Sequence, residues 1–294
     1  MNIKFTKFIA LFVILYVFIK NMWLGDDIFL TMRTVDNFVN GFGLVWNVGE
    51  RVQIFTHPLW MMIIVPFYYF IKSPYVTLYL ISGMVTLSAL VILLHRFAQT
   101  QKAVLFLTVA IISSASFIDY SSSGLENPLL HFISLLFILT LFKENTNPQK
   151  KIFLLSLLAA AGTLTRYDAV LLYIPALAFQ IYKNKDTLAL ALLSVIKGFV
   201  PLFLWELFSV IYYGFLFPNT YYAKALTGLP LSWKISNGIN YFANSIEWDP
   251  TTLLIVTVSI ILTFMQKTGT KKSIALGVVL YATYILTIGG DFMA

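Results

Sequence analysis

The sequence lacks cysteine and has few charged residues. None of its 294 residues is Cys, and only 11% are Asp, Glu, Lys or Arg. The first absence excludes a disulfide framework and a thiolate metal site. The second excludes a water-soluble fold, because soluble domains carry about 25% charged residues and this chain is 59% hydrophobic. The composition therefore predicts an integral membrane protein, with Phe and Tyr suited to a membrane core and its interfacial belts.

The positive net charge of +7 does not indicate a nucleic-acid partner. The Lys and Arg residues lie in short clusters between apolar runs, which is the pattern that membrane topology produces. The partner that this pattern predicts is the lipid bilayer. No internal repeat is evident, which counts slightly against transporters built from inverted repeats.

The apolar runs predict an all-α fold, a polytopic bundle of about nine transmembrane helices. The first run follows Lys4 and Lys7 as a secretory signal would, but no small-residue cleavage site follows it, so we expect an uncleaved helix. The fifth and sixth runs are short and abut each other. The predicted spans are roughly 5–23, 75–94, 103–118, 127–142, 152–165, 167–182, 188–212, 251–266 and 273–288.

The basic clusters predict the orientation of these spans. They place the N-terminus in the cytoplasm, and the loops at about 25–74 and 214–250 outside. Acidic residues do not set topology, yet most of them fall on the predicted outer side. They are Asp26, Asp27, Asp36, Glu50, Asp119, Glu126, Asp168, Glu247, Asp249 and Asp291.

The first outer loop is long enough to suggest a functional role. A short helix from Ile28 to Val39 is expected there, with Asp27 as its N-cap and Gly41 and Gly43 after its end. The apolar segment Pro58 to Ile71 could span the bilayer, but a span here would invert every later basic cluster. We therefore predict a helix lying in the outer interface.

Two adjacent carboxylates, Asp26 and Asp27, directly follow the first span. One interpretation is that one caps the next helix and the other faces water. The other is that one is a general base while its neighbour binds a metal or a sugar hydroxyl. Arg33 lies about two turns further on and is a candidate partner for a phosphate or for Asp36.

Four further candidates lie in the predicted first outer loop or at the outer ends of spans. His57 precedes Pro58, where a hydrogen-bonded structural role competes with a substrate role. Glu126 stands at the mouth of the fourth span, where a helix-capping acid and a substrate ligand are equally plausible. Arg166 and Asp168 bracket a very short turn, where they either pair with each other or line a cavity.

Three other positions complete the candidates. Lys224 is a cation on the predicted outer face, against the charge bias, and suits an anionic ligand. Glu206 lies within the seventh predicted span, and an acid inside a membrane is a functional-site hypothesis by default. Asp291 follows the Gly289–Gly290 turn near the end of the sequence. Carboxylates, cations and aromatics on one face together suit a sugar linked to an anionic lipid.

Several motifs resemble the membrane glycosyltransferases of the GT-C superfamily, in that family's order. The segment Gly25–Arg33 looks like the start of their first periplasmic loop. The stretch 37–52 with Thr56–Trp60 is similar to the branch of terminal beta-arabinofuranosyltransferases of actinobacterial cell walls. Further similar motifs are Ser123–Glu126, Thr165–Asp168, Pro218–Lys224 and Gly289–Met293.

The resemblance implies an inverting transfer of a sugar from a polyprenyl phosphate to a cell-envelope acceptor. It implies a bacterial cytoplasmic membrane, with the reaction on its external face and juxtamembrane helices in the first loop. Asp26 or Asp27 matches the family's general base. Arg33, Arg166, Lys224 or a divalent cation would offset the charge on the departing phosphate. Donor sugar and acceptor identity do not follow from the sequence.

The chain departs from the family pattern in three places. His57 stands where the family often has Asn, and Tyr167 where it often has Pro. Family members usually continue past the segment that matches Gly289–Met293, so the C-terminal part of the family is expected to be missing here. Two other functions stay open: a transporter or flippase for an anionic lipid or solute, and an inactive scaffold.

Overall fold

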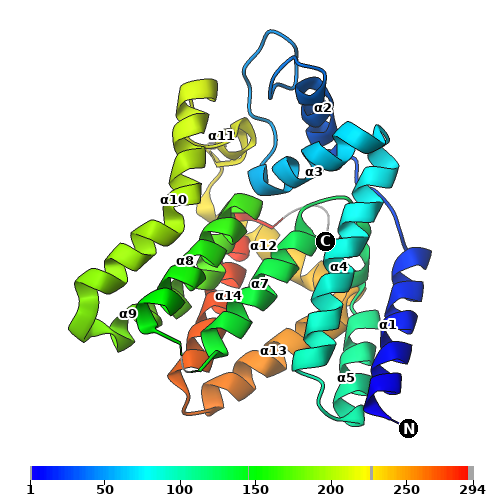
Figure 1. Ribbon diagram of the computed structural model, residues 1–294, viewed down its shortest axis with the longest axis vertical. Coiled ribbons are helices and arrows are strands. Elements are labelled where there is room, and N and C mark those ends of the chain that lie inside the picture. Colours follow the sequence, from blue (N-terminus) through cyan, green and yellow to red (C-terminus); the bar gives the residue numbers. More distant parts are fainter. Residues whose placement is uncertain (1, 145, 226–227, 291–294) are drawn as a thin grey trace. The chain divides into compact units, whose positions relative to one another are not determined.

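The computed structural model describes residues 2–144, 146–225 and 228–290, with residues 224 and 225 described by their backbone alone. Regular structure in these ranges is helical, without strands, which confirms the predicted all-α class (Figure 1). Two short 3-10 helices, η1 (Tyr167–Ala169) and η2 (Lys185–Thr187), occur beside the α-helices. The α-helices are α1 (Ile3–Lys20), α2 (Asp27–Val39), α3 (Pro58–Ile71), α4 (Pro74–Arg96), α5 (Gln101–Ile112), α6 (Ala115–Ser122), α7 (Asn127–Phe142), α8 (Pro148–Thr165), α9 (Val170–Lys183), α10 (Leu188–Tyr213), α11 (Asn219–Ala225), α12 (Leu231–Trp248), α13 (Pro250–Met265) and α14 (Gly269–Ile288).

The nine predicted spans all coincide with helical segments, but a count of nine spans is not supported. Among the described residues, three helices are long and apolar enough to cross a bilayer: α4, α10 with η2, and α14. The count rises to five if α5 with α6 and α12 with α13, bent by 69° and 110°, each form one span.

Length and charge explain why the other predicted spans fail. Helices α7 and α9 have 16 and 14 residues, so they measure about 24 and 21 Å against a hydrocarbon core of about 30 Å. Helix α1 carries Lys4, Lys7 and Lys20 within its 18 residues. Helix α8 begins with polar residues that include Lys150 and Lys151.

Contacts divide the chain into two compact units. Unit 1 comprises Met1–Arg51 and Pro58–Leu135, and unit 2 comprises Val52–His57 and Leu136–Ala294. The division falls inside α7. The short segment Val52–His57 belongs with unit 2 although its neighbours along the chain belong to unit 1.

In unit 1, α1 packs against α4, α5 and α6 (Figure 1). Its buried residues Ala10, Ile14 and Phe18 recur every four positions, so they form one stripe along the helix. The predicted span 103–118 is broken after α5. There the side chain of Ser114 accepts a hydrogen bond from the backbone N–H of Phe117, which caps a new helix, α6, at an angle to the first.

Helices α2 and α3 of unit 1 confirm the two helices predicted in the first loop. They pack against each other, and α3 also packs against α4. The indole N–H of the buried Trp60 donates to the carbonyl of Gly124 at 2.8 Å, which fixes α3 to the turn before α7. A Cβ at Gly124 would lie 2.9 Å from Leu24 and its φ is +80°, so this turn requires glycine. The interfacial position of α3 stays a prediction.

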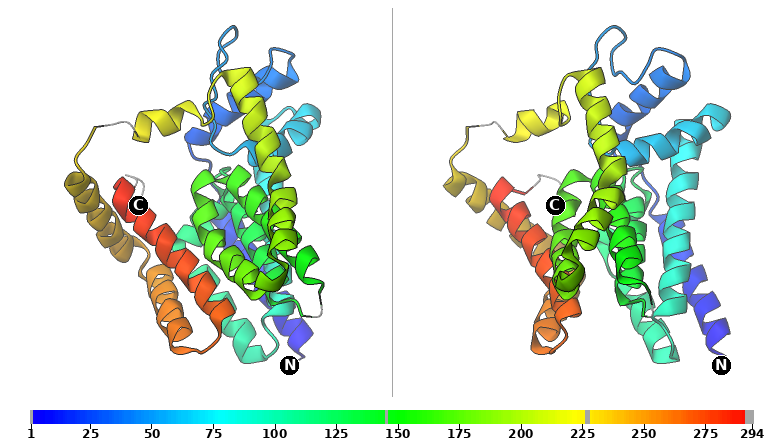
Figure 2. Two further views of the ribbon diagram at one scale, coloured as in Figure 1. Left: turned by 90° about the vertical axis from the view of Figure 1, so that its left-hand side faces the viewer. Right: turned by 60° about the vertical axis from the view of Figure 1, so that its left-hand side comes forward.

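In unit 2, close helix crossings are made at glycines. An added Cβ on Gly198 of α10 would collide with Ser156 of α8. Gly277 of α14 lies against the Leu172 carbonyl of α9 in the same way, and Gly238 of α12 lies against α14. Figure 2 shows α14 lying beside both α12 and α13, which follow each other with a sharp bend between them. Small residues allow this close approach in membrane bundles, where lipid supplies no hydrophobic driving force between helices.

Candidate functional site

The turn between α1 and α2 is tied by its backbone and side chains to the turn before α7. The Gly25 N–H donates to the Ser123 carbonyl at 2.9 Å. The indole N–H of Trp23 donates to the Asp119 carbonyl, also at 2.9 Å. Asp26 and Asp27 follow directly and are exposed. The backbone of the acidic pair is therefore held in place while both side chains face outward.

The two aspartates have different local roles, and the predicted N-cap was wrong. Asp26, not Asp27, is the N-cap of α2, and its Oδ1 accepts the backbone N–H of Asp27 at 3.0 Å. Asp27 is the first residue of the helix, so its carboxylate is not used for this cap. The sequence misplaced the cap because either residue satisfies the same preference for Asp before a helix.

Arg33 is held on the exposed side of α2 by the loop that comes after this helix. Its guanidinium lies 4.5 Å from the ring centre of Trp46 and donates to Oδ1 of Asn47 at 3.0 Å. Asn37 folds this loop back by donating to the carbonyls of Val45 and Trp46. A cation stacked on an aromatic ring loses little conformational freedom when it binds an anion. Arg33 is therefore a preorganised positive charge, about 9 Å along the helix from Asp27.

Asp36 has a partner other than the one considered from the sequence. The hydroxyl of Tyr68 in α3 donates to its Oδ1 at 2.8 Å. Burial, and then the bonded carboxylate of Asp36, raise the pKa of Tyr68 to about 12. The bond joins α2 to α3, so Asp36 stabilises the packing of these two helices.

His57 and Glu126 are both buried and lie in different units. His57 belongs to the Val52–His57 segment of unit 2 and is 5% exposed. Glu126, 6% exposed, precedes α7 in unit 1, and its carbonyl accepts the first helical bond, from the Leu130 N–H. Glu126 therefore stands directly before α7, and the role of its carboxylate stays a prediction. The side chain of Lys224, and the whole of Asp291, lie outside the described residues.

Arg166 and Asp168 form an ion pair, which is one of the two alternatives considered from the sequence. Nε of Arg166 lies 2.9 and 3.2 Å from the two oxygens of Asp168. The hydroxyl of Tyr281 in α14 also donates to Asp168, at 3.4 Å. The Arg166 side chain remains 42% exposed, while that of Asp168 is 16% exposed. Asp168 thus orients an arginine that solvent can reach, in the turn between α8 and η1.

The sequence did not reveal a polar cluster in unit 2 beside this ion pair. Its members come from segments far apart in the sequence. The Ser209 hydroxyl donates to Oε1 of Gln53 at 3.0 Å, and the Trp205 indole N–H donates to the Tyr167 hydroxyl at 3.2 Å. Glu206 completes the cluster with both carboxylate oxygens buried. Burial raises the pKa of Tyr167 above its ordinary value, and the charge of Glu206 adds to the rise.

Phe55 extends the same cluster with apolar contacts. Its ring lies 6.0 Å from Trp205 and 6.5 Å from Tyr213, both in α10. The Asn219 N–H at the start of α11 donates to the Gln53 carbonyl at 3.0 Å. These contacts explain why Val52–His57 belongs with unit 2. Glu206 was the one sequence signal for the cluster, as an acid within an apolar run.

A preformed metal centre is not visible in the described part of the chain. Residues 2–144, 146–225 and 228–290 contain no group of three or more His, Asp or Glu side chains that could hold an ion. Asp26 and Asp27 offer two adjacent carboxylates. A divalent cation at this pair would need further oxygen ligands from water or from a substrate phosphate.

Comparison with known proteins gives one functional lead. The chain is 27% identical over 242 residues to a terminal beta-(1->2)-arabinofuranosyltransferase of Mycobacterium tuberculosis, and the match covers 76% of this chain and 38% of that protein. The chain thus spans well under half the length of this relative. No family model matches the chain. No solved structure matches it either.

Proposed function

We propose that this chain is a membrane glycosyltransferase that moves a sugar from a polyprenyl-phosphate donor to a hydroxyl of a cell-envelope acceptor, on the external face of the cytoplasmic membrane. The similarity to an arabinofuranosyltransferase supports glycosyl transfer in broad terms. The apolar helices support a membrane setting. The observation that carries the proposal is the Asp26–Asp27 pair, exposed at the head of α2 on a backbone tied to the Ser123 turn.

The proposed reaction is a single displacement with inversion at the anomeric carbon. The acceptor oxygen forms the new bond to that carbon while its proton passes to the Asp27 carboxylate. The bond from the anomeric carbon to the phosphate oxygen breaks, and its electrons leave with the polyprenyl phosphate. We assign Asp27 rather than Asp26 as the base because Asp26 already accepts the N–H that caps α2.

The leaving phosphate needs positive charge that is already in place. Arg166 meets this requirement in unit 2, because Asp168 fixes its Nε and leaves the side chain partly exposed. Arg33 meets it in unit 1, through its stacking on Trp46. Arg33 and Arg166 are therefore the two candidates for binding the donor phosphate. Arg33 belongs to the same unit as Asp27, while Arg166 has the aromatic neighbours Tyr167 and Tyr281, of the kind that sugar rings stack on.

Radiolabel transfer tests the proposal directly. Membranes that contain the protein are supplied with polyprenyl phosphates carrying different labelled sugars, and label in the cell-envelope fraction is counted. We expect one donor to give label above that of membranes without the protein. Movement of the labelled lipid across the bilayer without sugar transfer would instead identify a flippase, and no effect with any donor would leave the scaffold interpretation.

A further inference from the structure

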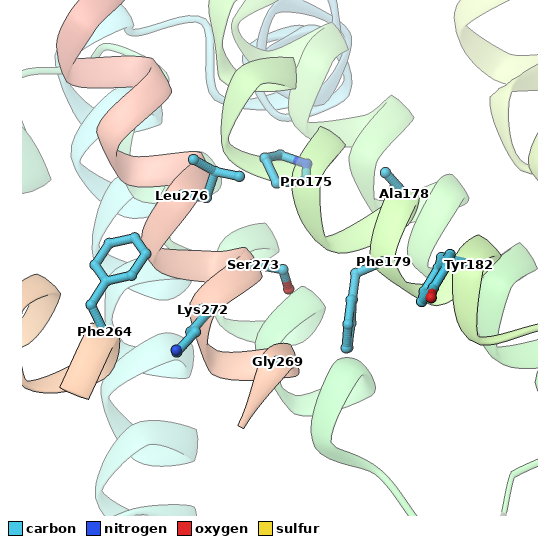
Figure 3. Close-up of a pocket in the computed structure, with 9 residues that line it drawn as sticks. All are labelled: Pro175, Ala178, Phe179, Tyr182, Phe264, Gly269, Lys272, Ser273 and Leu276. Atoms are coloured by element: carbon cyan, nitrogen blue, oxygen red, sulfur yellow. The ribbon is translucent and has the colours of Figure 1, made fainter. Parts of the chain in front are cut away.

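A groove in unit 2 runs between α9, α13 and α14, away from the residues proposed for transfer. It is a hollow of about 440 Å³, within the range of about 300–1,000 Å³ usual for small-molecule sites. In Figure 3, Ser273 and Leu276 of α14 point toward α9, where Pro175 and Phe179 lie. Its lining is largely apolar and includes Pro175, Phe179, Phe264, Gly269, Lys272 and Leu276.

Positive charge gathers where the groove reaches the end of α9. Nζ of Lys183, the last residue of α9, lies 5.4 Å from the ring centre of Phe179. Lys272 lines the groove near the start of α14, beside Gly269. Gly269 itself packs so closely on the Phe179 ring that an added Cβ would lie 2.5 Å from it. Lys183 thus lies at this ring on α9, while Lys272 lines the groove on α14 with its side chain pointing away from Phe179 (Figure 3).

A third lysine shows that this positive charge is only partly balanced. Burial lowers the pKa of Lys151 in α8, and the nearby charge of Lys183 lowers it further, while Glu144 acts in the opposite direction. Lys151 donates to the backbone carbonyl of Lys143, which supplies a dipole and no negative charge. A bound anion would relieve the repulsion between Lys151 and Lys183.

We propose that this groove binds an anionic phospholipid of the bilayer, with the phosphate at Lys183 and Lys272 and an acyl chain along the apolar lining. Both lysines stand at helix ends, so the phosphate lies at the level of the lipid headgroups. The exposed hydroxyl-bearing ring of Tyr182 lies at the same end, as aromatic residues do in the interfacial region. A phospholipid satisfies the charge and the apolar surface together, which a soluble anion does not.

Native mass spectrometry of the purified chain in mixed detergent micelles tests the site. Phosphatidylglycerol and phosphatidylcholine with the same acyl chains are offered in equal amounts, and the ratio of bound forms is measured. We expect the wild-type protein to bind phosphatidylglycerol several-fold more, and Lys183→Gln with Lys272→Gln to bring the ratio close to one. Lys102→Gln is the matched control, since Lys102 is an exposed lysine at the start of α5 in unit 1.

Three results would overturn the proposal. The first is equal binding of the two lipids by the wild-type protein. The second is an equal loss of preference in Lys102→Gln, which would indicate attraction by net charge alone. The third is displacement of phosphatidylglycerol by equimolar polyprenyl phosphate, which would assign the groove to another lipid. Lys183→Arg with Lys272→Arg should retain the preference, which separates loss of charge from loss of fold.

Discussion

At the scale of single residues, the neighbours Asp26 and Asp27 differ in how their side chains interact with the backbone. The carboxylate of Asp26 caps α2, whereas that of Asp27 faces outward from the first turn. One residue of the pair thus caps the helix, as the first sequence interpretation expected, and the role of Asp27 as a general base stays a proposal.

Asp27→Asn should abolish most of the transfer while leaving the fold intact. Asn keeps the shape of the side chain but cannot accept a proton, and general-base catalysis contributes about 10²–10⁴-fold in rate. Asp26→Asn is the control, because Asn caps helices as well as Asp does. The measurement is initial rate of label transfer, with thermal unfolding in detergent as the check on fold. Near-normal transfer in both variants would show that the pair is only a cap and a solvated charge.

Arg166→Lys should weaken donor binding more than it slows turnover. Lysine keeps the positive charge but cannot present the Nε that both Asp168 oxygens hold. We expect the donor KM to rise about tenfold, equivalent to about 1.4 kcal/mol, with a smaller change in kcat. Arg33→Lys is the comparison, since Arg33 is held by Trp46 and Asn47 in unit 1. A larger KM effect at Arg33 would identify Arg33, and not Arg166, as the arginine that binds the donor phosphate.

At the scale of helices, the sequence predicted which segments are helical better than it predicted where a helix breaks. Every apolar run predicted as a span is helical, because a backbone buried in lipid or protein must satisfy its own hydrogen bonds. The break at Ser114 was missed because a serine within an apolar run reads as part of a span, and only its capping bond to Phe117 shows otherwise. Helix α12 was missed because polar residues such as Lys234 and Asn237 interrupt its apolar positions, so a search for continuous apolar runs passes over it.

Among the candidate residues, the sequence predicted contacts between near neighbours along the chain and missed contacts between distant segments. The Arg166–Asp168 pair was visible because its members are two residues apart. The hydrogen bond from Ser209 to Gln53 joins residues 156 positions apart, and nothing in either local sequence indicates it. Short motifs can therefore be read directly, whereas clusters built by folding need a structure.

Gly198→Ala should destabilise the protein by about 1–3 kcal/mol, as overpacking of a close contact typically does. An added Cβ would collide with Ser156 and lie 2.9 Å from the Leu157 backbone, which cannot move as a side chain would. Gly83→Ala in α4 is the matched control, because its Cβ would meet only the Phe18 ring at an ordinary 3.9 Å. Thermal unfolding in detergent checks both. Equal stability of Gly198→Ala and wild type would contradict the close packing of α8 and α10.

At the scale of the whole molecule, the number of crossings and the charge distribution must agree. Three to five helices meet the length and apolarity required of a span in the described residues, fewer than the basic clusters alone suggested. Removing one span moves every later loop to the opposite side, so a corrected count must lose spans in pairs to preserve the predicted sides. The short helices α7 and α9 are each shorter than the hydrocarbon core, but α8 lies between them, so losing both would move the loops at Lys150 and Arg166 to the opposite sides.

Single-cysteine labelling of intact cells measures these sides without background, because the native chain has no Cys. In unit 1, we expect Cys at Val48 to react with an impermeant maleimide, since this residue is 62% exposed in the predicted external loop. Cys at Lys102 should react only after permeabilisation, because α4 lies between the two positions and is long and apolar enough to cross. Cys at Lys271 tests unit 2, where the positive clusters predict the cytoplasm. If Val48 and Lys102 label from the same side, α4 does not cross. If Val48 reacts only after permeabilisation, the external placement of Asp27 is wrong.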